Sequence, residues 1–369
     1  MHSFCRSVVV VAVALSPVAC APAQSAASRP MAVGAAASPA AASPAADQPV
    51  ELGSVAWHRD YRAARAAARA TDRPLLLLFQ EVPGCATCRN YGRDVLDHPI
   101  IVGVAQEHFV PACIYNNTAG DHDAEVRQAF GEPAWNNPVV RIVDPSEQEL
   151  APRVSGAWTV LALAEAMAAA LDRLERPTPL PLQLLLQEER ARAGGATATA
   201  VYEMACFWSG EAGLGRLEGV VGTEAGWLGG REVVRVTYDP KAVTYAALTR
   251  AAQQQRCARG AFADRGQLDD ARAVFGDGVR PLRAGFRADA EPKYHLSRSP
   301  LRVVPMTELQ AARVNAHLHD GDWRQFLTGS QLAILDRQKS SGADWPSAVG
   351  VAPAAAWRQA RALAAGGSR

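Results

Sequence analysis

The chain has 369 residues, too many for one ordinary domain and suited to two. Hydrophobic residues make up 49% of it, which is enough for two cores, and the formal net charge is +1. Because the charge is balanced and the chain has no long basic run and no zinc-finger spacing, nucleic-acid binding is not expected.

The first 21 residues have the layout of a secretory signal peptide. A short stretch with one arginine precedes an apolar run over residues 8–15, which is too short to span a bilayer, and small residues follow. Ala19-Cys20-Ala21 fits a cleavage site, whereas residues 18–20 resemble the end of a lipobox, in which Cys20 is lipidated. Both alternatives predict export to the periplasm or cell envelope, and a lipid anchor at Cys20 is the only membrane attachment predicted.

The number of cysteines favours redox chemistry. Export removes Cys5 and removes or lipidates Cys20, so five cysteines remain in an oxidising compartment. Five is odd, which leaves at least one thiol free and argues against a purely structural disulfide framework. Cys113 lies in an apolar strand pattern and is expected to be a small buried hydrophobe.

The first half predicts an α/β domain over residues 48–176, preceded by a flexible Ala/Pro/Ser-rich tether over residues 22–47. Helical and strand patterns alternate along it, as in α/β layer folds. In chain order we expect a helix over 57–71, a strand over 74–80, helices over 85–96 and 99–108, a strand over 109–115, a helix over 121–130, strands over 138–144 and 150–156, and a helix over 158–175.

Cys85 and Cys88 form a Cys-x-x-Cys motif at the predicted start of a helix, directly after a buried strand. Unpaired N–H groups and the helix dipole stabilise a thiolate there, and the spacing lets the second thiol attack a mixed disulfide on the first. Cys85 is therefore the predicted nucleophile and Cys88 its resolving partner. A metal pair and an inert disulfide are the alternatives. A metal would need further ligands, and because the sequence has no second Cys-x-x-Cys and no His-x-x-x-His, no metal is predicted.

Strand, Cys-x-x-Cys, helix and a later proline before a strand together resemble the thioredoxin superfamily over about residues 50–176. The resemblance implies a thioredoxin-like fold in which Pro138 is the cis-proline beside the dithiol. Gly84 stands where thioredoxins have Trp. Residues 82–85 (Val-Pro-Gly-Cys) are more similar to a group of thioredoxin-like proteins in which some members carry selenocysteine at the position of Cys85, which implies a reactive first cysteine.

The second half predicts a separate domain over residues 198–345, after a Pro- and Gly-containing linker over 177–197 and before a tail over 346–369. Within it we expect a strand over 197–205, a helix over 206–217, paired strands over 219–227 and 232–238 across two glycines, and a helix over 244–257. From 258 to 325 the pattern indicates no clear element, and a helix follows over 325–338.

Cys206 lies between the predicted strand and helix, again a position that favours a thiolate, and is followed directly by Phe207 and Trp208. These aromatics either form a pocket for an apolar group or pack in the core. Residues 205–208 resemble the Gly-Cys-Phe-Trp motif of the A-type peptide methionine sulfoxide reductases, matching three of four positions. Residues 219–227 and 232–240 are similar to the next segments of that family, and Glu291, Tyr294 and His295 match loosely a later one.

The resemblance covers about residues 199–300 and implies an α+β reductase-like domain. It implies that Cys206 attacks the sulfoxide sulfur and that Glu232 protonates the departing oxygen. Phe207 and Trp208 would hold the S-methyl group, with Trp227 where the family has Tyr.

A second thiol must then condense with the sulfenic acid formed on Cys206. Cys257 is the resolving candidate, and the alternative is a plain cysteine at a helix end. An attached thioredoxin-like domain would reduce the resulting disulfide at high effective concentration.

Two departures from the family leave the reaction open. The His-Ala-Glu of the family is Gly230-Arg231-Glu232 here, and its Asp- and Tyr-bearing segment, expected near residues 257–275, contains no Tyr. Three interpretations therefore remain: a peptide methionine S-sulfoxide reductase with its own thioredoxin-like reductant, a thiol–disulfide oxidoreductase whose second half only binds clients, and a non-catalytic envelope protein. The predicted partners are oxidised peptides or proteins and an upstream thiol reductant. No cofactor is predicted, because no Gly-x-Gly-x-x-Gly follows a candidate strand.

Overall fold

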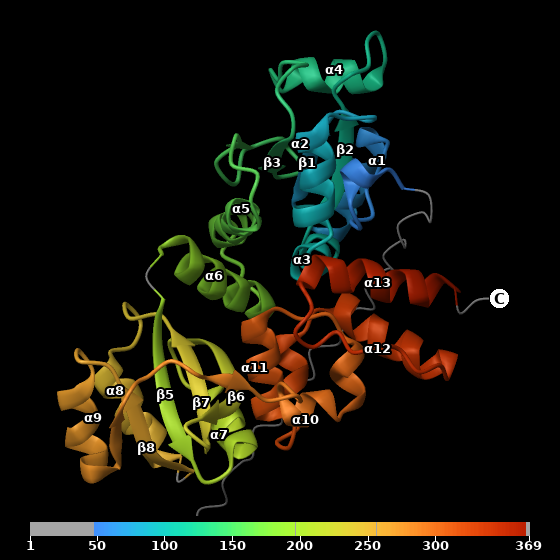
Figure 1. The fold of residues 1–369 in the computed structure, drawn as a ribbon. Helices are drawn as coiled ribbons and strands as arrows, with labels where there is room; N and C mark the ends of the chain where they lie inside the picture. Colours follow the sequence, from blue (N-terminus) through green and yellow to red (C-terminus); the bar gives the residue numbers. More distant parts are fainter. Residues whose placement is uncertain (1–47, 196, 256, 367–369) are drawn as a thin grey trace, which may run out of the picture. The chain divides into compact units, whose positions relative to one another are not determined.

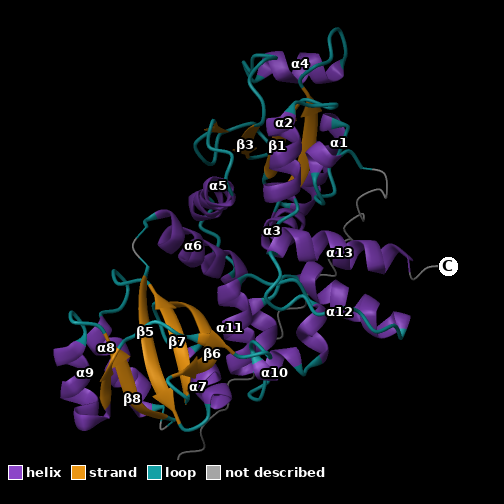
Figure 2. Cartoon of the chain, viewed as in Figure 1, coloured by secondary structure: helices purple, strands orange, loops and turns teal. Residues whose placement is uncertain are grey.

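The computed structural model describes residues 48–195, 197–255 and 257–366 (Figure 1). The expected signal peptide, Cys20 and the tether lie outside the described residues. The described strands form two sheets, one of four strands and one of six (Figure 2). Among the described helices, none is long and apolar enough to cross a membrane.

The first sheet is built on β1 (Leu75–Gln80), which is buried along its whole length. It pairs in parallel with β2 (Val110–Tyr115) and antiparallel with β3 (Val139–Val143), and β3 pairs with the short edge strand β4 (Val154–Ser155). Alternate β1 side chains enter different cores, because successive side chains of a strand point to opposite faces. A central strand covered on both faces accounts for the unbroken apolar run in the sequence.

The helices of this half occur in the predicted order. Asp60 begins the first of them, because its carboxylate accepts the amide hydrogens of Arg62 and Ala63. The helices are α1 (Tyr61–Thr71), α2 (Ala86–Tyr91) with its π-helical continuation η2 (Gly92–Leu96), α3 (Pro99–His108), α4 (His122–Ala129) and α5 (Val160–Arg173). A short 3-10 turn, η1 (Val50–Leu52), precedes them.

The stretch expected to be an interdomain linker contains a packed helix, α6 (Leu180–Ala193). Leu182 and Leu185 on it are fully buried. Pro179 is its N-cap and Pro181 lies in its first turn, where a missing amide hydrogen is tolerated. The prolines that suggested a linker therefore begin a helix.

The second sheet has the order β10-β6-β7-β5-β8-β9. The hairpin predicted across two glycines is present: Leu228 is paired with Arg231, and Gly229 and Gly230 have φ values of 58° and 75°. Positive φ at both central residues is what a type I′ turn requires, and glycine adopts it without strain. The strands are β5 (Ala198–Met204), β6 (Val220–Leu228), β7 (Arg231–Tyr238), β8 (Ala258–Ala263), β9 (Val279–Pro281) and β10 (Arg287–Ala288).

Helices cover one face of this sheet, where the core includes Phe207, Leu248 and Ala271. The other face carries a smaller apolar cluster with Phe286 packed on it. The helices of this core are α7 (Phe207–Leu214), α8 (Tyr245–Gln254) and α9 (Leu268–Phe275), followed by the 3-10 turn η3 (Gly276–Gly278). The later helices α10 (Tyr294–Ser297), α11 (Glu308–His317) and α12 (Gly329–Ser341), with the 3-10 turns η4 (Pro300–Val303) and η5 (Asp322–Phe326), place buried apolar residues in the hydrophobic cluster that contains Leu96. The sequence indicated no element over residues 258–325, but in the structure most of this stretch forms short helices and strands.

The expected tail over residues 346–369 contains α13 (Pro353–Gly366). Trp357 and Ala360 are buried in the same hydrophobic cluster as Leu96. Nη1 of Arg358 lies 3.2 Å from Oδ2 of the buried Asp97. Apolar residues spaced three and four apart put one face of α13 against the first half of the chain, so this segment is part of the fold.

Two candidate thiol sites

Cys85 and Cys88 are free thiols at the start of α2, with 3.6 Å between their sulfurs. Cys85 is the N-cap of the helix and is exposed, whereas Cys88 is fully buried. A hydrogen bond from the Cys88 amide lowers the pKa of Cys85 below its ordinary value, and burial raises the pKa of Cys88 to about 12. Of the two sulfurs, that of Cys85 is therefore the more accessible and the more easily ionised.

Gly84, which stands where thioredoxins have Trp, is required by close packing. A Cβ atom at this position would lie 2.5 Å from the Glu81 carbonyl oxygen and 2.6 Å from Cβ of Cys88. The Gly84 amide donates a hydrogen bond of 2.8 Å to a carboxylate oxygen of the buried Glu51. Any larger residue would displace the loop that carries the motif.

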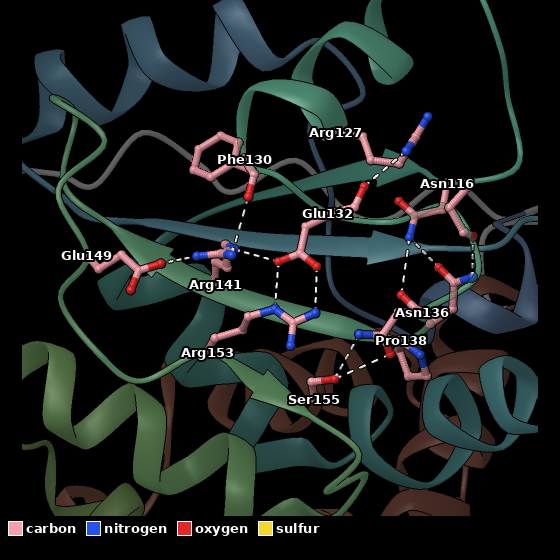
Figure 3. Close-up of polar contacts among 12 residues, drawn as sticks. Asn116, Arg127, Phe130, Glu132, Asn136, Pro138, Arg141, Glu149, Arg153 and Ser155 are labelled. Carbon is pink, nitrogen blue, oxygen red and sulfur yellow. Dashed lines mark hydrogen bonds and ion pairs between the residues drawn. The ribbon is translucent and has the colours of Figure 1, made fainter.

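The Asn137–Pro138 peptide bond is cis, as the thioredoxin resemblance implied, and the Val82–Pro83 bond is cis as well. The amide group of Asn116, just after β2, donates to the side chain of Asn137 and, at 3.4 Å, to the backbone oxygen of Asn136 (Figure 3).

The next residue along the chain, Asn117, contacts the loop that carries the redox motif. Its side-chain oxygen accepts the Val82 amide hydrogen at 3.2 Å, and its side-chain nitrogen lies 3.3 Å from the Val82 carbonyl oxygen. The turn after β2 therefore joins the redox-motif loop to the loop that contains Pro138.

A buried carboxylate orders the chain that leads to Pro138 (Figure 3). The Glu132 side chain is 1% exposed and accepts hydrogen bonds from Arg141 Nε at 2.6 Å and from Arg153 Nη2 at 2.6 Å. Burial by itself raises the pKa of Glu132, but the hydrogen bonds and charges of the two arginines outweigh it and hold the pKa below its ordinary value. The sequence offered no signal for this cluster.

We expect Cys85 of the reduced protein to react with iodoacetamide at a pH below that needed for an ordinary thiol, because its thiolate is stabilised. Cys88 should stay unmodified until the pH approaches about 12. Peptide mapping by mass spectrometry at successive pH values measures both. The buried Cys113, whose pKa is raised by burial, is the internal control. Equal reaction of Cys85 and Cys88 would contradict the assigned roles.

The second site is centred on Cys206, the half-buried N-cap of α7. Its sulfur lies 3.6 Å from the Ser209 hydroxyl oxygen. A carboxylate oxygen of Glu232, on β7, accepts the amide hydrogen of Phe207 at 2.9 Å. The predicted acid and the predicted nucleophile are thus brought to the same helix start, from positions 26 residues apart in the numbering.

Of the three predicted substrate-binding aromatics, Phe207 contacts both Trp208 and Trp227. The ring centroid of Phe207 lies 5.4 Å from that of Trp208 and 5.3 Å from that of Trp227. Trp208 is in turn held by two residues that the sequence did not assign to the site. Tyr294 stacks on it at 3.8 Å, and Asp289 accepts its indole N–H at 3.0 Å.

Asp289 and Tyr294 come from the segment after β10, not from residues 257–275, where an Asp and a Tyr were sought. A buried ion pair of 3.0 Å between Lys293 and Glu211 ties this segment to α7. The loose Glu–Tyr–His match around Tyr294 was the only sequence signal, and Asp289 had none.

Cys257 lies beside the Cys206 site. The Ala205 amide donates a hydrogen bond of 2.8 Å to the Cys257 carbonyl oxygen, where β5 pairs with β8. Both cysteines are free and half-buried. Among the described residues, no side-chain hydrogen bond links this pair to Cys85 or Cys88.

Comparison with known proteins finds relatives of two kinds. Residues 56–145 match the family model described as Thioredoxin-like. Over an alignment of 66 residues the sequence is 39% identical to the peptide methionine sulfoxide reductases MsrA of Methanococcus maripaludis strains C7 and C5, and the match covers 13% of this chain and 42% of each relative. It is 28% identical over 174 residues to the peptide methionine sulfoxide reductase A5 of Oryza sativa subsp. japonica, covering 33% of this chain and 68% of that protein.

The chain therefore spans less than half the length of the Methanococcus relatives. A solved structure, DsbH oxidoreductase, aligns with 34% of this chain and 90% of its own chain, at 15% sequence identity and a TM-score of 0.28. A thioredoxin-like α/β domain is thus joined to a domain similar to the A-type peptide methionine sulfoxide reductases, and both predicted resemblances are confirmed. These similarities support a thiol-dependent oxidoreductase.

Proposed function

We propose that this protein reduces methionine S-sulfoxide in peptides or proteins at Cys206 and that its Cys85–Cys88 pair supplies the reducing equivalents. The observation that carries the proposal is the contact between Glu232 and the Phe207 amide at 2.9 Å, which keeps a carboxylic acid at the helix start occupied by Cys206. Nucleophile and acid are then within reach of one substrate group.

In the first step the Cys206 thiolate attacks the sulfoxide sulfur while Glu232 donates a proton to the sulfoxide oxygen. The oxygen passes to Cys206, which becomes a sulfenic acid, and the methionine thioether leaves. Phe207, Trp208 and Trp227 form an aromatic surface suited to the S-methyl group. Asp289 and Tyr294 hold Trp208 in place through a 3.0 Å hydrogen bond and a 3.8 Å stack.

Cys257 is the proposed resolving thiol. It condenses with the sulfenic acid, so that an S–S bond forms and water leaves. The 2.8 Å backbone hydrogen bond between Ala205 and Cys257 supports this role, because it keeps Cys257 one strand away from the residue that precedes Cys206. Cys85 then attacks the disulfide and Cys88 resolves the mixed disulfide, which leaves the first pair oxidised. A dithiol reductant of the periplasm or cell envelope restores it.

The second candidate function is a thiol–disulfide oxidoreductase whose second domain only binds clients. The exposed Cys85 with its lowered pKa favours this alternative, because that site has the features of disulfide exchange without any help from Cys206.

The test is a single turnover of the reduced full chain with a peptide that contains methionine S-sulfoxide. Mass spectrometry should show loss of about one oxygen atom per chain, with a Cys85–Cys88 disulfide in the wild-type chain and a retained Cys206–Cys257 disulfide in Cys85→Ser/Cys88→Ser. In Cys257→Ser the sulfenic acid should persist on Cys206 and be trapped by dimedone. The matched methionine R-sulfoxide peptide is the control. If no oxygen is lost while Cys85 and Cys88 still reduce a disulfide substrate, the second candidate function holds instead.

A further inference from the structure

The loop that carries the redox motif brings a carboxylate to the two sulfurs. Glu81 directly follows β1 and is half-buried, and one potential ligand atom from each of Glu81, Cys85 and Cys88 lies within 4.8 Å of the other two. We propose that Glu81 and the reduced Cys85–Cys88 pair bind a soft divalent cation, foremost Zn²⁺, which withholds both thiols from disulfide exchange. The sequence predicted no metal because Cys85 and Cys88 alone offer too few ligands. Glu81 supplies a third.

The spacing of the sulfurs suits such an ion. They lie 3.6 Å apart. Two thiolates on a tetrahedral zinc at about 2.3 Å are about 3.8 Å from each other, so the pair needs almost no rearrangement. The carboxylate must approach further, and the half-buried side chain of Glu81 has rotatable bonds with which to do so. Water completes a four-coordinate site, and it can enter because Cys85 is exposed.

The charges around the loop favour a cation. The Glu51 carboxylate accepts the Gly84 amide hydrogen at 2.8 Å and adds negative charge beside the ligands. Arg89 opposes it: its guanidinium donates to the Gly84 carbonyl oxygen at 2.7 Å. The ion displaces the thiol protons as it binds. The two thiolates and the carboxylates of Glu81 and Glu51 then carry four negative charges, against the two positive charges of the ion and the one of Arg89.

Metal binding and oxidation exclude each other at this site. Binding one cation displaces up to two thiol protons and moves no electrons. Exchange with an oxidised disulfide substrate joins the two sulfurs in a disulfide, passes two electrons to the substrate disulfide, which becomes two thiols, and so removes both thiolate ligands and releases the ion. The proposal rests on residues of the first domain alone, and it stands whether or not Cys206 reduces sulfoxides.

The experiment titrates Zn²⁺ into the reduced full chain in competition with a chromophoric chelator. The background is Cys206→Ser/Cys257→Ser, so that the other thiol pair contributes nothing. We expect about one Zn²⁺ per chain, lost in Cys85→Ser and lost on oxidation. Glu81→Gln should weaken binding by at least about tenfold, because a negatively charged carboxylate ligand is replaced by a neutral amide, which binds zinc weakly. Glu125→Gln, an exposed carboxylate on α4, is the matched control and should bind as tightly as the parent chain.

Glu81→Asp keeps a carboxylate and should recover part of the affinity, which separates ligation from an effect on folding. A second readout is protection: bound Zn²⁺ should block iodoacetamide from Cys85, and a chelator should restore the reaction. Failure of the reduced chain to bind Zn²⁺ would overturn the proposal. So would equal affinities of Glu81→Gln and Glu125→Gln, because the carboxylate would then have no part in binding.

Discussion

Replacing Glu232 by Gln is expected to slow methionine sulfoxide reduction by about 10²–10⁴-fold, the usual contribution of a positioned general acid. A glutamine keeps an oxygen that can accept the Phe207 amide hydrogen, now held at 2.9 Å, so the start of α7 should be preserved. What is lost is the proton for the departing oxygen. The measurement is the single-turnover rate of oxygen loss from a methionine S-sulfoxide peptide.

Two further variants are the controls for the rate measured with Glu232→Gln. Cys206→Ser removes the nucleophile and should show no turnover at all. Glu224→Gln changes another half-buried carboxylate of the same sheet, one paired with Arg235, and should leave the rate unchanged. A wild-type rate in Glu232→Gln would mean that Glu232 only caps the helix, and another group would have to supply the proton.

Replacing Glu132 by Ala is expected to lower the free energy of unfolding by about 2–4 kcal/mol. Breaking a fully buried ion pair costs about 3–5 kcal/mol, and this value is reduced because the side chains of Arg141 and Arg153 are 16% and 29% exposed. The variant leaves two guanidinium groups with little water and without the carboxylate that both contact. Urea denaturation near neutral pH measures the change.

The effect of Glu132→Ala should depend on pH in a definite direction. The folded-state pKa of Glu132 lies below its ordinary value, so its stabilisation is present above that ordinary value and is lost as the pH falls through the folded-state pKa. The difference from the wild-type protein should therefore shrink in acid. Glu149→Ala removes an exposed partner of Arg141 and should cost less than about 1 kcal/mol at any pH. Similar losses for the two variants would contradict the buried cluster.

Local patterns were enough to find most elements of the first domain, the hairpin of the second and the two cysteines that begin helices. A continuous apolar run identified β1, because a strand covered on both faces has no polar side. Two consecutive glycines predicted the hairpin between β6 and β7, because a two-residue turn depends only on local residues that can adopt positive φ. Cys85 and Cys206 were recognised because each was expected to begin a helix, and each is an N-cap in the structure.

The helices α6 and α13 show where local patterns misled. Prolines at the start of α6 were interpreted as a linker, although proline is well tolerated in a first helical turn. The buried positions of α13 lie in a segment that the sequence predicts to be a tail. Both helices are stabilised by packing their apolar side chains into the hydrophobic cluster that contains Leu96.

By itself the sequence determined the two domain types, the two cysteines that begin helices and the proline that is cis. The tertiary structure alone decided which distant side chains complete each site. Asp289 forms a hydrogen bond with Trp208, which is 81 residues away in the sequence, and Glu132 forms one with Arg153, which is 21 residues away. Cys257 adjoins the Cys206 site only because β8 pairs with β5. The physical reason is that helix starts, turns and buried strands depend on neighbouring residues, whereas hydrogen bonds, ion pairs and strand register between distant segments form only once the whole chain has packed.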